Sequence, residues 1–190
     1  MNEEQEKIYN EIISEYNFNE GQLYQIRIGL INGLDISSYL STGFKEEQMK
    51  QIRLGLEQGL DISWYAKPEF YWTQMLQIRL GLKNKVDVSI YAKTEFTANQ
   101  MSEIRWGLQK NLDISWYAKP EFNTAQMFQI RLGLESKVDV SIYAQLDFNY
   151  SQMHEICKGL EKGIDVSPYL NPTIDWKEMR AIRKKLRSKK

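Results

Sequence analysis

The stretch Thr97–Phe122, TANQMSEIRWGLQKNLDISWYAKPEF, decides the fold, because close variants of it return every 26 residues. In each full copy an Ile is followed at once by Arg, except for Cys157 in the sixth copy, then by Gly-Leu, and then by an Asp that stands two residues before Ser and four before Tyr. Six full copies and a partial seventh can be aligned, and repetition at such a period is typical of a stacked array. The Ile column contains Ile26, Ile52, Ile78, Ile104, Ile130, Ile156 and Ile182.

The first part of each copy predicts an amphipathic helix of about 13 residues. In the copy quoted above, Thr97 can cap this helix and Gln100 can complete a capping box. Phe96 and Met101 stand where a hydrophobic staple requires them. The same cap is expected at Asn19, Asn123, Asn149 and Asp175.

The second part predicts a turn and a much shorter helix. Asn111 follows the long helix at a position that favours left-handed backbone, as do Gly33, Gly59 and Gly163 in other copies. Asp113 then caps a helix of about 5 residues, too short to survive alone. Since neither helix buries its apolar side without neighbours, we expect an all-α fold, an α-solenoid of about seven helical-hairpin repeats.

The glycine of each copy lies inside the long helix, where it costs about 1 kcal/mol relative to alanine. Its return in Gly29, Gly55, Gly81, Gly107, Gly133 and Gly159 indicates a close approach between successive helices.

Three segments are expected along the chain. Residues 1–17 contain Ile8, Tyr9, Ile12, Ile13 and Tyr16 at helical spacing, which predicts an N-terminal capping helix. Residues 18–174 form the tandem repeats, and residues 175–190 form a basic C-terminal helix that caps the other end.

Composition excludes several classes of protein. No apolar run is long enough to cross a membrane, and four prolines and eleven glycines are too few for a linker-rich chain. The acidic, polar start is wrong for a secretory signal. A single cysteine and a single histidine exclude a disulfide framework and the usual Cys/His zinc site. We therefore expect a soluble, cytoplasmic protein with no bound metal or cofactor.

No constellation of residues predicts catalysis. His154 and Cys157 stand three residues apart on one expected helix, but no third orienting group or oxyanion site accompanies them. Cys157 replaces the Arg of the repeat, and the column of His154 holds unrelated residues such as Lys50 and Ser102. We interpret both as drift of the repeat and expect no enzyme.

The arginine column has two interpretations. One is a structural ladder in which each Arg binds an Asp or a carbonyl group and links successive repeats. The other is a row of guanidinium groups that follows a phosphate backbone. The Asp column in register with the Arg column favours the ladder. The column contains Arg27, Arg53, Arg79, Arg105, Arg131 and Arg183.

Large apolar residues at positions that vary between copies are candidates for a binding surface. Packing in the core is the alternative, but Trp and Tyr anchors dominate protein-binding surfaces. The expected partner-binding residues are Trp64, Tyr71, Trp72, Leu76, Trp106, Trp116 and Phe128.

The end of the chain is strongly basic although the whole chain is neutral. Residues 177–190 carry a net charge of +7, so the remainder carries −7. A solvated last helix whose basic residues suit the helix dipole explains this charge, and a contact with nucleic acid or another acidic partner is the alternative. The residues concerned are Lys177, Arg180, Arg183, Lys184, Lys185, Arg187, Lys189 and Lys190.

With Gln126-Met127, Ile130-Arg131, Gly133-Leu134, Asp139-Val140-Ser141 and Tyr143-Ala144, the sequence resembles short tandem repeats of bacterial mobile-element and phage-associated proteins. The resemblance covers about residues 18–187 and carries over no functional residue. It implies a setting in which a small rigid binder inhibits a host defence protein such as a CRISPR effector.

The sequence as a whole predicts a non-enzymatic repeat scaffold that binds another protein through its variable aromatic positions. The expected partner is a bacterial host protein or complex, and no membrane partner is expected. The alternative is a nucleic-acid-binding helical repeat protein that uses the arginine column and the basic C-terminal residues Arg180, Arg183, Lys184, Lys185 and Arg187.

Overall fold

The computed structural model describes residues 1–41 and 43–188, and Lys189 and Lys190 of the basic C-terminal segment lie outside this range. These residues form α-helices and short 3-10 helices and no β-strand. The α-helices are α1 (Glu3–Glu15), α2 (Glu20–Ile31), α3 (Glu46–Glu57), α4 (Trp72–Lys83), α5 (Ala98–Gln109), α6 (Thr124–Glu135), α7 (Tyr150–Glu161) and α8 (Trp176–Arg187). The 3-10 helices are η1 (Ile36–Tyr39), η2 (Ile62–Trp64), η3 (Val88–Ile90), η4 (Ile114–Trp116), η5 (Val140–Ile142) and η6 (Ser167–Tyr169).

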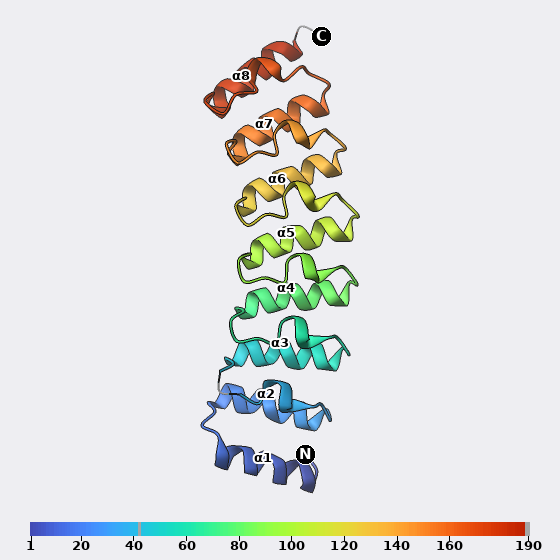
Figure 1. Cartoon of the computed structure of the whole chain (residues 1–190), viewed down its shortest axis with the longest axis vertical. Helices are drawn as coiled ribbons and strands as arrows, with labels where there is room; N and C mark the ends of the chain where they lie inside the picture. Colours follow the sequence, from blue (N-terminus) through green and yellow to red (C-terminus); the bar gives the residue numbers. More distant parts are fainter. Residues whose placement is uncertain (42, 189–190) are drawn as a thin grey trace. The chain divides into compact units, whose positions relative to one another are not determined.

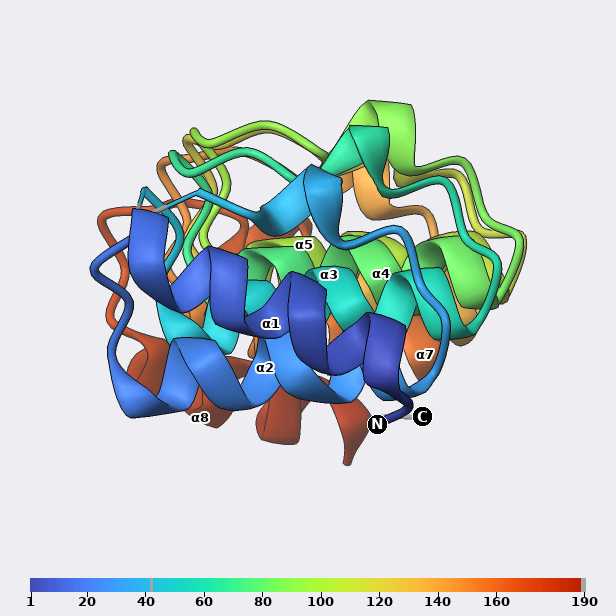
Figure 2. The same ribbon diagram turned by 90° about the horizontal axis from the view of Figure 1, so that it is seen from below.

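The chain divides into two compact units, the first ending at Met101 and the second beginning at Ser102. In the first unit α1 packs on α2, α2 on α3 and α3 on α4; in the second α6 packs on α7 and α7 on α8 (Figure 1). In the first unit the short helices η1 and η2 lie on one side of the long helices α2 and α3 (Figure 2). The predicted all-α solenoid fold is confirmed.

The predicted helix signals operate as expected. The Asn19 side chain accepts from the Gln22 N–H at 2.9 Å, and the Gln22 side chain accepts from the Asn19 N–H at 2.9 Å. The ends of the long helices also follow the prediction. After α5, Asn111 has a φ of 53°. Lys85 and Lys137 adopt the same left-handed backbone, which is less favourable for these residues than for Gly. Each long helix of the repeat is 12 residues long.

The short helices differ from the prediction. They are 3-10 helices of three or four residues, where the sequence predicts a longer turn of helix. The Asp side chain at the cap bonds the residue two places on, as Asp61 Oδ1 does with the Ser63 N–H at 3.1 Å. This tight start and the early exit of the chain at Tyr65 hold the segment to a single 3-10 turn.

A tyrosine at the end of each short helix packs against the glycine of the preceding long helix. Tyr117 is fully buried, its hydroxyl donates to the Glu103 carbonyl oxygen at 3.2 Å, and a Cβ added to Gly107 would lie 1.9 Å from that hydroxyl oxygen. The close approach predicted for the glycine is therefore made by a side chain of the same repeat and not by the next helix. The pairs are Gly29 and Tyr39, Gly55 and Tyr65, Gly81 and Tyr91, Gly107 and Tyr117, Gly133 and Tyr143, and Gly159 and Tyr169.

Within each unit the capping glutamine also links one repeat to the next. Gln48 accepts from the Lys45 N–H through Oε1, and its Nε2 donates to the Phe70 carbonyl oxygen at 2.7 Å. Phe70 stands just before the following long helix, so one buried amide both caps a helix and joins two repeats. The same link occurs from Gln22 to Phe44, from Gln74 to Phe96, from Gln126 to Phe148 and from Gln152 to Ile174.

The N-terminal helix covers the first repeat with only part of its apolar surface. Ile12 is buried against the rest of its unit and the Gln5 side chain donates to the Leu30 carbonyl oxygen at 2.7 Å, but Ile8 and Ile13 remain exposed. In the part of the chain that the structure describes, no helix has the length and apolar character that a bilayer span requires.

The packing of Tyr117 on Gly107 predicts that Gly107→Ala destabilises the protein. The added methyl group would overlap the tyrosine hydroxyl, and overpacking of this kind costs about 1–3 kcal/mol. For a chain of this size the melting temperature should fall by about 2–10 °C in a thermal unfolding experiment.

Tyr117→Phe supplies the control, because it removes the oxygen atom that the methyl group would meet. The fall in melting temperature of the double variant should be smaller than the sum of the falls in the two single variants. Strict additivity would contradict the proposed contact.

Candidate functional site

The arginine column forms a structural ladder within each unit, in which an Arg of one long helix bonds a side chain of the helix before it. In the first unit Arg53 Nε donates to Gln25 Oε1 and Arg79 Nε donates to Gln51 Oε1, both at 3.0 Å. In the second unit Arg131 Nε donates to Glu103 Oε2 at 2.7 Å. In each pair the acceptor precedes the Arg by 28 residues, which is one repeat and two further positions.

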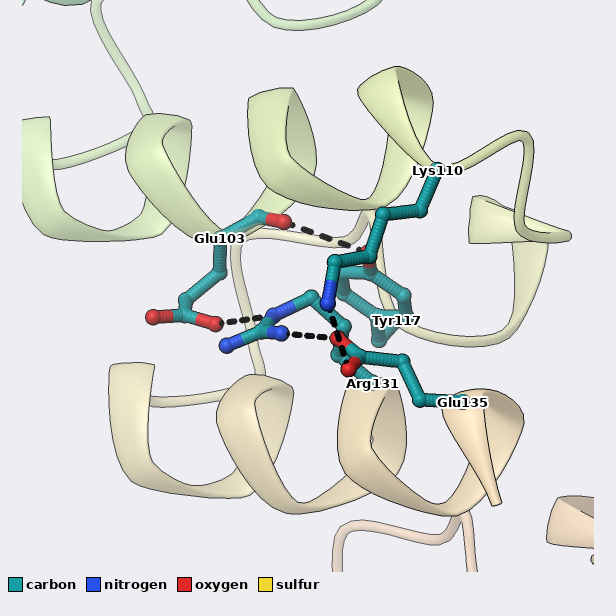
Figure 3. A network of polar contacts seen from close by, with 5 residues as sticks. All are labelled: Glu103, Lys110, Tyr117, Arg131 and Glu135. Carbon is teal, nitrogen blue, oxygen red and sulfur yellow. Dashed lines mark hydrogen bonds and ion pairs between the residues drawn. The ribbon is translucent and has the colours of Figure 1, made fainter.

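Figure 3 shows this arrangement around Arg131. Its guanidinium group lies between Glu103 of α5 and Glu135 of its own helix α6, and it donates to both carboxylates. Lys110 donates to the same Glu135 at 2.6 Å. A planar donor fork with two carboxylates on different edges is held in one orientation, which a Lys ammonium group cannot reproduce.

The acceptors of Arg53, Arg79, Arg131 and Arg183 are Gln or Glu side chains and not the Asp column, so the prediction of an Arg–Asp link is wrong for these arginines. Each of these Asp residues instead accepts from the Ser two places later, as Asp35 does from the Ser37 N–H at 3.0 Å. The hydrogen bonds from Ser37 hold the pKa of Asp35 below its usual value. A short-range backbone partner is therefore preferred over an arginine of the same register.

The two kinds of acceptor give the ladder different electrostatics. Burial lowers the pKa of Arg79, whose acceptor Gln51 is neutral. Burial also acts to lower the pKa of Arg131, but the carboxylates of Glu103 and Glu135 outweigh it and raise the pKa above its usual value. Arg131 is thus the better compensated charge.

The ladder leaves little of the arginine column for a ligand. Arg53, Arg79, Arg105, Arg131 and Arg183 are between 5% and 9% exposed, and only Arg27 of the column is on the surface. Arg183 was expected on the basic surface of the last helix, but it is buried and donates to Glu155 Oε2 at 2.8 and 2.6 Å.

The hydrogen bonds of His154 and Cys157 go to different residues, Gln129 and Glu161. His154 Nδ1 lies 3.1 Å from Gln129 Oε1, the acceptor that the arginine ladder would use in that repeat, and Cys157 is buried in the arginine column. Burial raises the pKa of the Cys157 thiol and lowers the pKa of His154. Across residues 1–41 and 43–188, no three His, Cys, Asp or Glu side chains are grouped so as to hold a metal ion.

In the first unit the expected aromatic positions are exposed. Tyr71 is 73% exposed, Trp72 43% and Trp64 37%, while Leu76 is half-buried on α4. Tyr71 and Trp72 line a hollow of about 530 Å³ together with Pro68 and neighbouring polar residues. Trp64 lies on the short helix η2 and does not line this hollow.

In the second unit two of the expected aromatic side chains, Trp106 and Phe128, contact buried arginines. Trp106 is 45% exposed and its ring centroid lies 5.0 Å from the Arg105 guanidinium carbon. Phe128 is half-buried, with the Arg131 guanidinium carbon 5.3 Å from its ring centroid. Trp116, on η4, is 37% exposed. Cation–π contacts of this kind restrain the orientation of the two rings.

Sequence reasoning missed some exposed aromatic residues of the same columns. Tyr24 stands in the column of Leu76 and Phe128 and is strongly exposed, and Tyr150 stands in the column of Trp72 and stacks on His154. Reading every member of each variable column would have found both residues.

A comparison with protein-family models, with curated proteins and with solved structures finds no match to this chain.

The ladder predicts that Arg131→Lys lowers the stability of the protein. Lysine can serve only one of the two carboxylates that Arg131 joins, and a partly buried acceptor left without its donor costs about 1–3 kcal/mol. Thermal unfolding should show a melting temperature lower by about 2–10 °C.

Glu103→Gln is the matched control, because the other repeats hold Gln25, Gln51, Gln77 and Gln129 in the same column. This variant should melt close to the unmodified protein. An Arg131→Lys variant that also melts there would show that the ladder contributes nothing to stability.

Proposed function

We propose that the chain is a non-enzymatic repeat scaffold that binds another protein through the exposed aromatic side chains of its two units. The observation that carries this proposal is a division between columns. The recurring polar residues, such as Gln48 and Arg79, are buried and bonded inside the stack, whereas Trp72 and Trp106 are exposed. Covering the exposed part of a large ring with a partner removes apolar surface from water, which is favourable.

Stacking does not require these rings. The column of Trp72 holds Ala98 and Thr124 in the next two repeats, which form the same helix start without an aromatic residue. The column of Trp106 holds Leu80 and Leu132 in its two neighbours. Aromatic residues that are free of a packing role are the ones expected to anchor a partner.

The rings are also presented by rigid elements. The Tyr71 N–H donates to Gln74 Oε1 at 2.8 Å, which fixes the start of α4 beside the hollow. Trp106 stands on α5 next to the buried Arg105. Because these groups are ordered before binding, a partner loses less conformational entropy on association.

The resemblance to repeats of mobile-element and phage-associated proteins supports a bacterial setting for this binding. We propose that the protein acts in the cytoplasm on a bacterial host protein or complex. A defence protein such as a CRISPR effector is the partner class to test first.

Fewer basic side chains are accessible to a nucleic acid than the sequence indicates. Five arginines of the column are buried, which removes the regular row of exposed guanidinium groups. Five exposed basic side chains of α8 remain for an anionic partner: Lys177, Arg180, Lys184, Lys185 and Arg187.

The proposal predicts that substitutions copied from neighbouring repeats abolish binding without unfolding the chain. The full-length protein is used to capture its partner from a bacterial lysate, and the affinity for the partner identified by mass spectrometry is then measured for each variant. Trp72→Ala, Trp106→Leu and Phe128→Ser each install the residue of another repeat. Loss of an anchoring aromatic side chain should weaken binding by about 30-fold or more.

Thr124→Ala is the matched control for Trp72→Ala, because both variants place alanine in the same column. Its affinity should be unchanged. If none of the aromatic variants alters the affinity while circular dichroism shows them folded, these side chains are not the binding surface.

A further inference from the structure

The N-terminal helix α1 carries an excess of exposed negative charge. Its exposed charged residues are five glutamates and one lysine, a net charge of −4. No ion pair within the described residues neutralises these carboxylates. The residues are Glu3, Glu4, Glu6, Lys7, Glu11 and Glu15.

Part of this charge lines a shallow hollow on α1. The hollow has a volume of about 660 Å³, and the charged residues of its lining are Glu3, Glu6 and Glu11 with Lys7. The helix packs on α2 through other residues, with Ile12 buried and Gln5 bonded to Leu30. The acidic surface is therefore not used within its own unit.

The C-terminal helix α8 carries the opposite charge. Its exposed charged residues are five basic side chains and Glu178, a net charge of +4. Lys177, Arg180, Lys184 and Arg187 recur at a spacing that places them along one side of the helix. Contact with α7 is made through other residues, with Met179 buried and Arg183 paired to Glu155.

The outer surface of α8 lacks the groups by which one repeat holds the next. Glu178 stands in the column of the linking glutamines and has no amide donor, and Ala181 stands in the column of the ladder acceptors. Lys185 occupies the glycine column, where a following tyrosine would need space. A further repeat would find none of its usual contacts here, so the surface is suited to a partner recognised by charge.

We propose that α8 of one copy docks against α1 of a second copy, head to tail. The two helices have similar lengths, 13 and 12 residues, and equal and opposite exposed charge. Because the joined surfaces differ, each added copy exposes a new α1 or α8, and the product is a ring or an open chain of copies. A contact between exposed charges is weak and is screened by salt. This assembly does not depend on the aromatic surface.

The test measures the mass of the full chain by sedimentation velocity over a range of protein concentrations. At about 0.01 M salt the average mass should rise with concentration above that of the 22.5 kDa chain. At about 1 M salt it should return to the mass of one chain. The mass of one chain at every concentration in low salt overturns the proposal. Binding of α8 to the α1 of its own chain would also give this result, and it would overturn the proposal as well.

Charge exchange makes the test specific for the two helices. One variant carries Arg180→Glu, Lys184→Glu and Arg187→Glu, and the other carries Glu3→Lys, Glu6→Lys and Glu11→Lys. Each variant alone should remain a single chain, because its α1 and α8 have like charge. An equimolar mixture should associate again, because each variant then offers the surface that the other lacks. Failure of the mixture to associate, with both variants folded by circular dichroism, overturns the proposal.

A matched control reverses three exposed lysines of one loop column, Lys67→Glu, Lys93→Glu and Lys119→Glu, and should leave association unchanged. Equal loss of association in this control would indicate a general effect of net charge and would overturn the assignment to α1 and α8. A short polynucleotide is titrated in parallel. If the unmodified chain stays single but binds the polynucleotide, and the α8 variant does not, the basic surface belongs to nucleic acid.

Discussion

The structure depends on the contact between a tyrosine and a glycine inside each repeat. The tyrosine ring of the short helix fills the space that a side chain on the long helix would occupy, and a Cβ at Gly55 would lie 1.8 Å from the Tyr65 hydroxyl oxygen. This contact folds the short helix back over the long one and closes the hairpin. The hairpin then presents Gln and Arg side chains at fixed places, from which the links between repeats are made. Without the hairpin neither link would have a partner within reach.

Local signals allowed much of this fold to be predicted. Capping boxes, left-handed ends and Asp caps depend on residues no more than six positions apart, so their chemistry can be read directly from the sequence. The period then forces successive hairpins into equivalent environments. The length of the short helices could not be predicted as well from the sequence. The 3-10 turn ends where the tyrosine turns toward the glycine, and this is a tertiary contact.

The partner of the arginine column could not be predicted in the same way. Asp61 stands at the same distance from Arg53 as the corresponding Asp does from the Arg of other copies, which suggested a pair. Its carboxylate instead accepts hydrogen bonds from Ser63. The true acceptor, Gln25, stands 28 residues before the arginine, and only the packing of two helices brings the two together. The exposure of Trp72 and Trp106 was predicted only as one of two alternatives, because a bulky residue at a variable position fits a core as well as a surface until its neighbours are known.

The direction of the two links has a consequence for how such a chain can change in length. The glutamine reaches forward to the following repeat and the arginine reaches back to the preceding one. Excision or duplication of a 26-residue block therefore rejoins equivalent donors and acceptors wherever the neighbouring repeats keep the Gln and Arg columns. A chain built in this way can gain or lose whole repeats while the bonds between the remaining repeats are kept, so its length changes in steps of 26 residues.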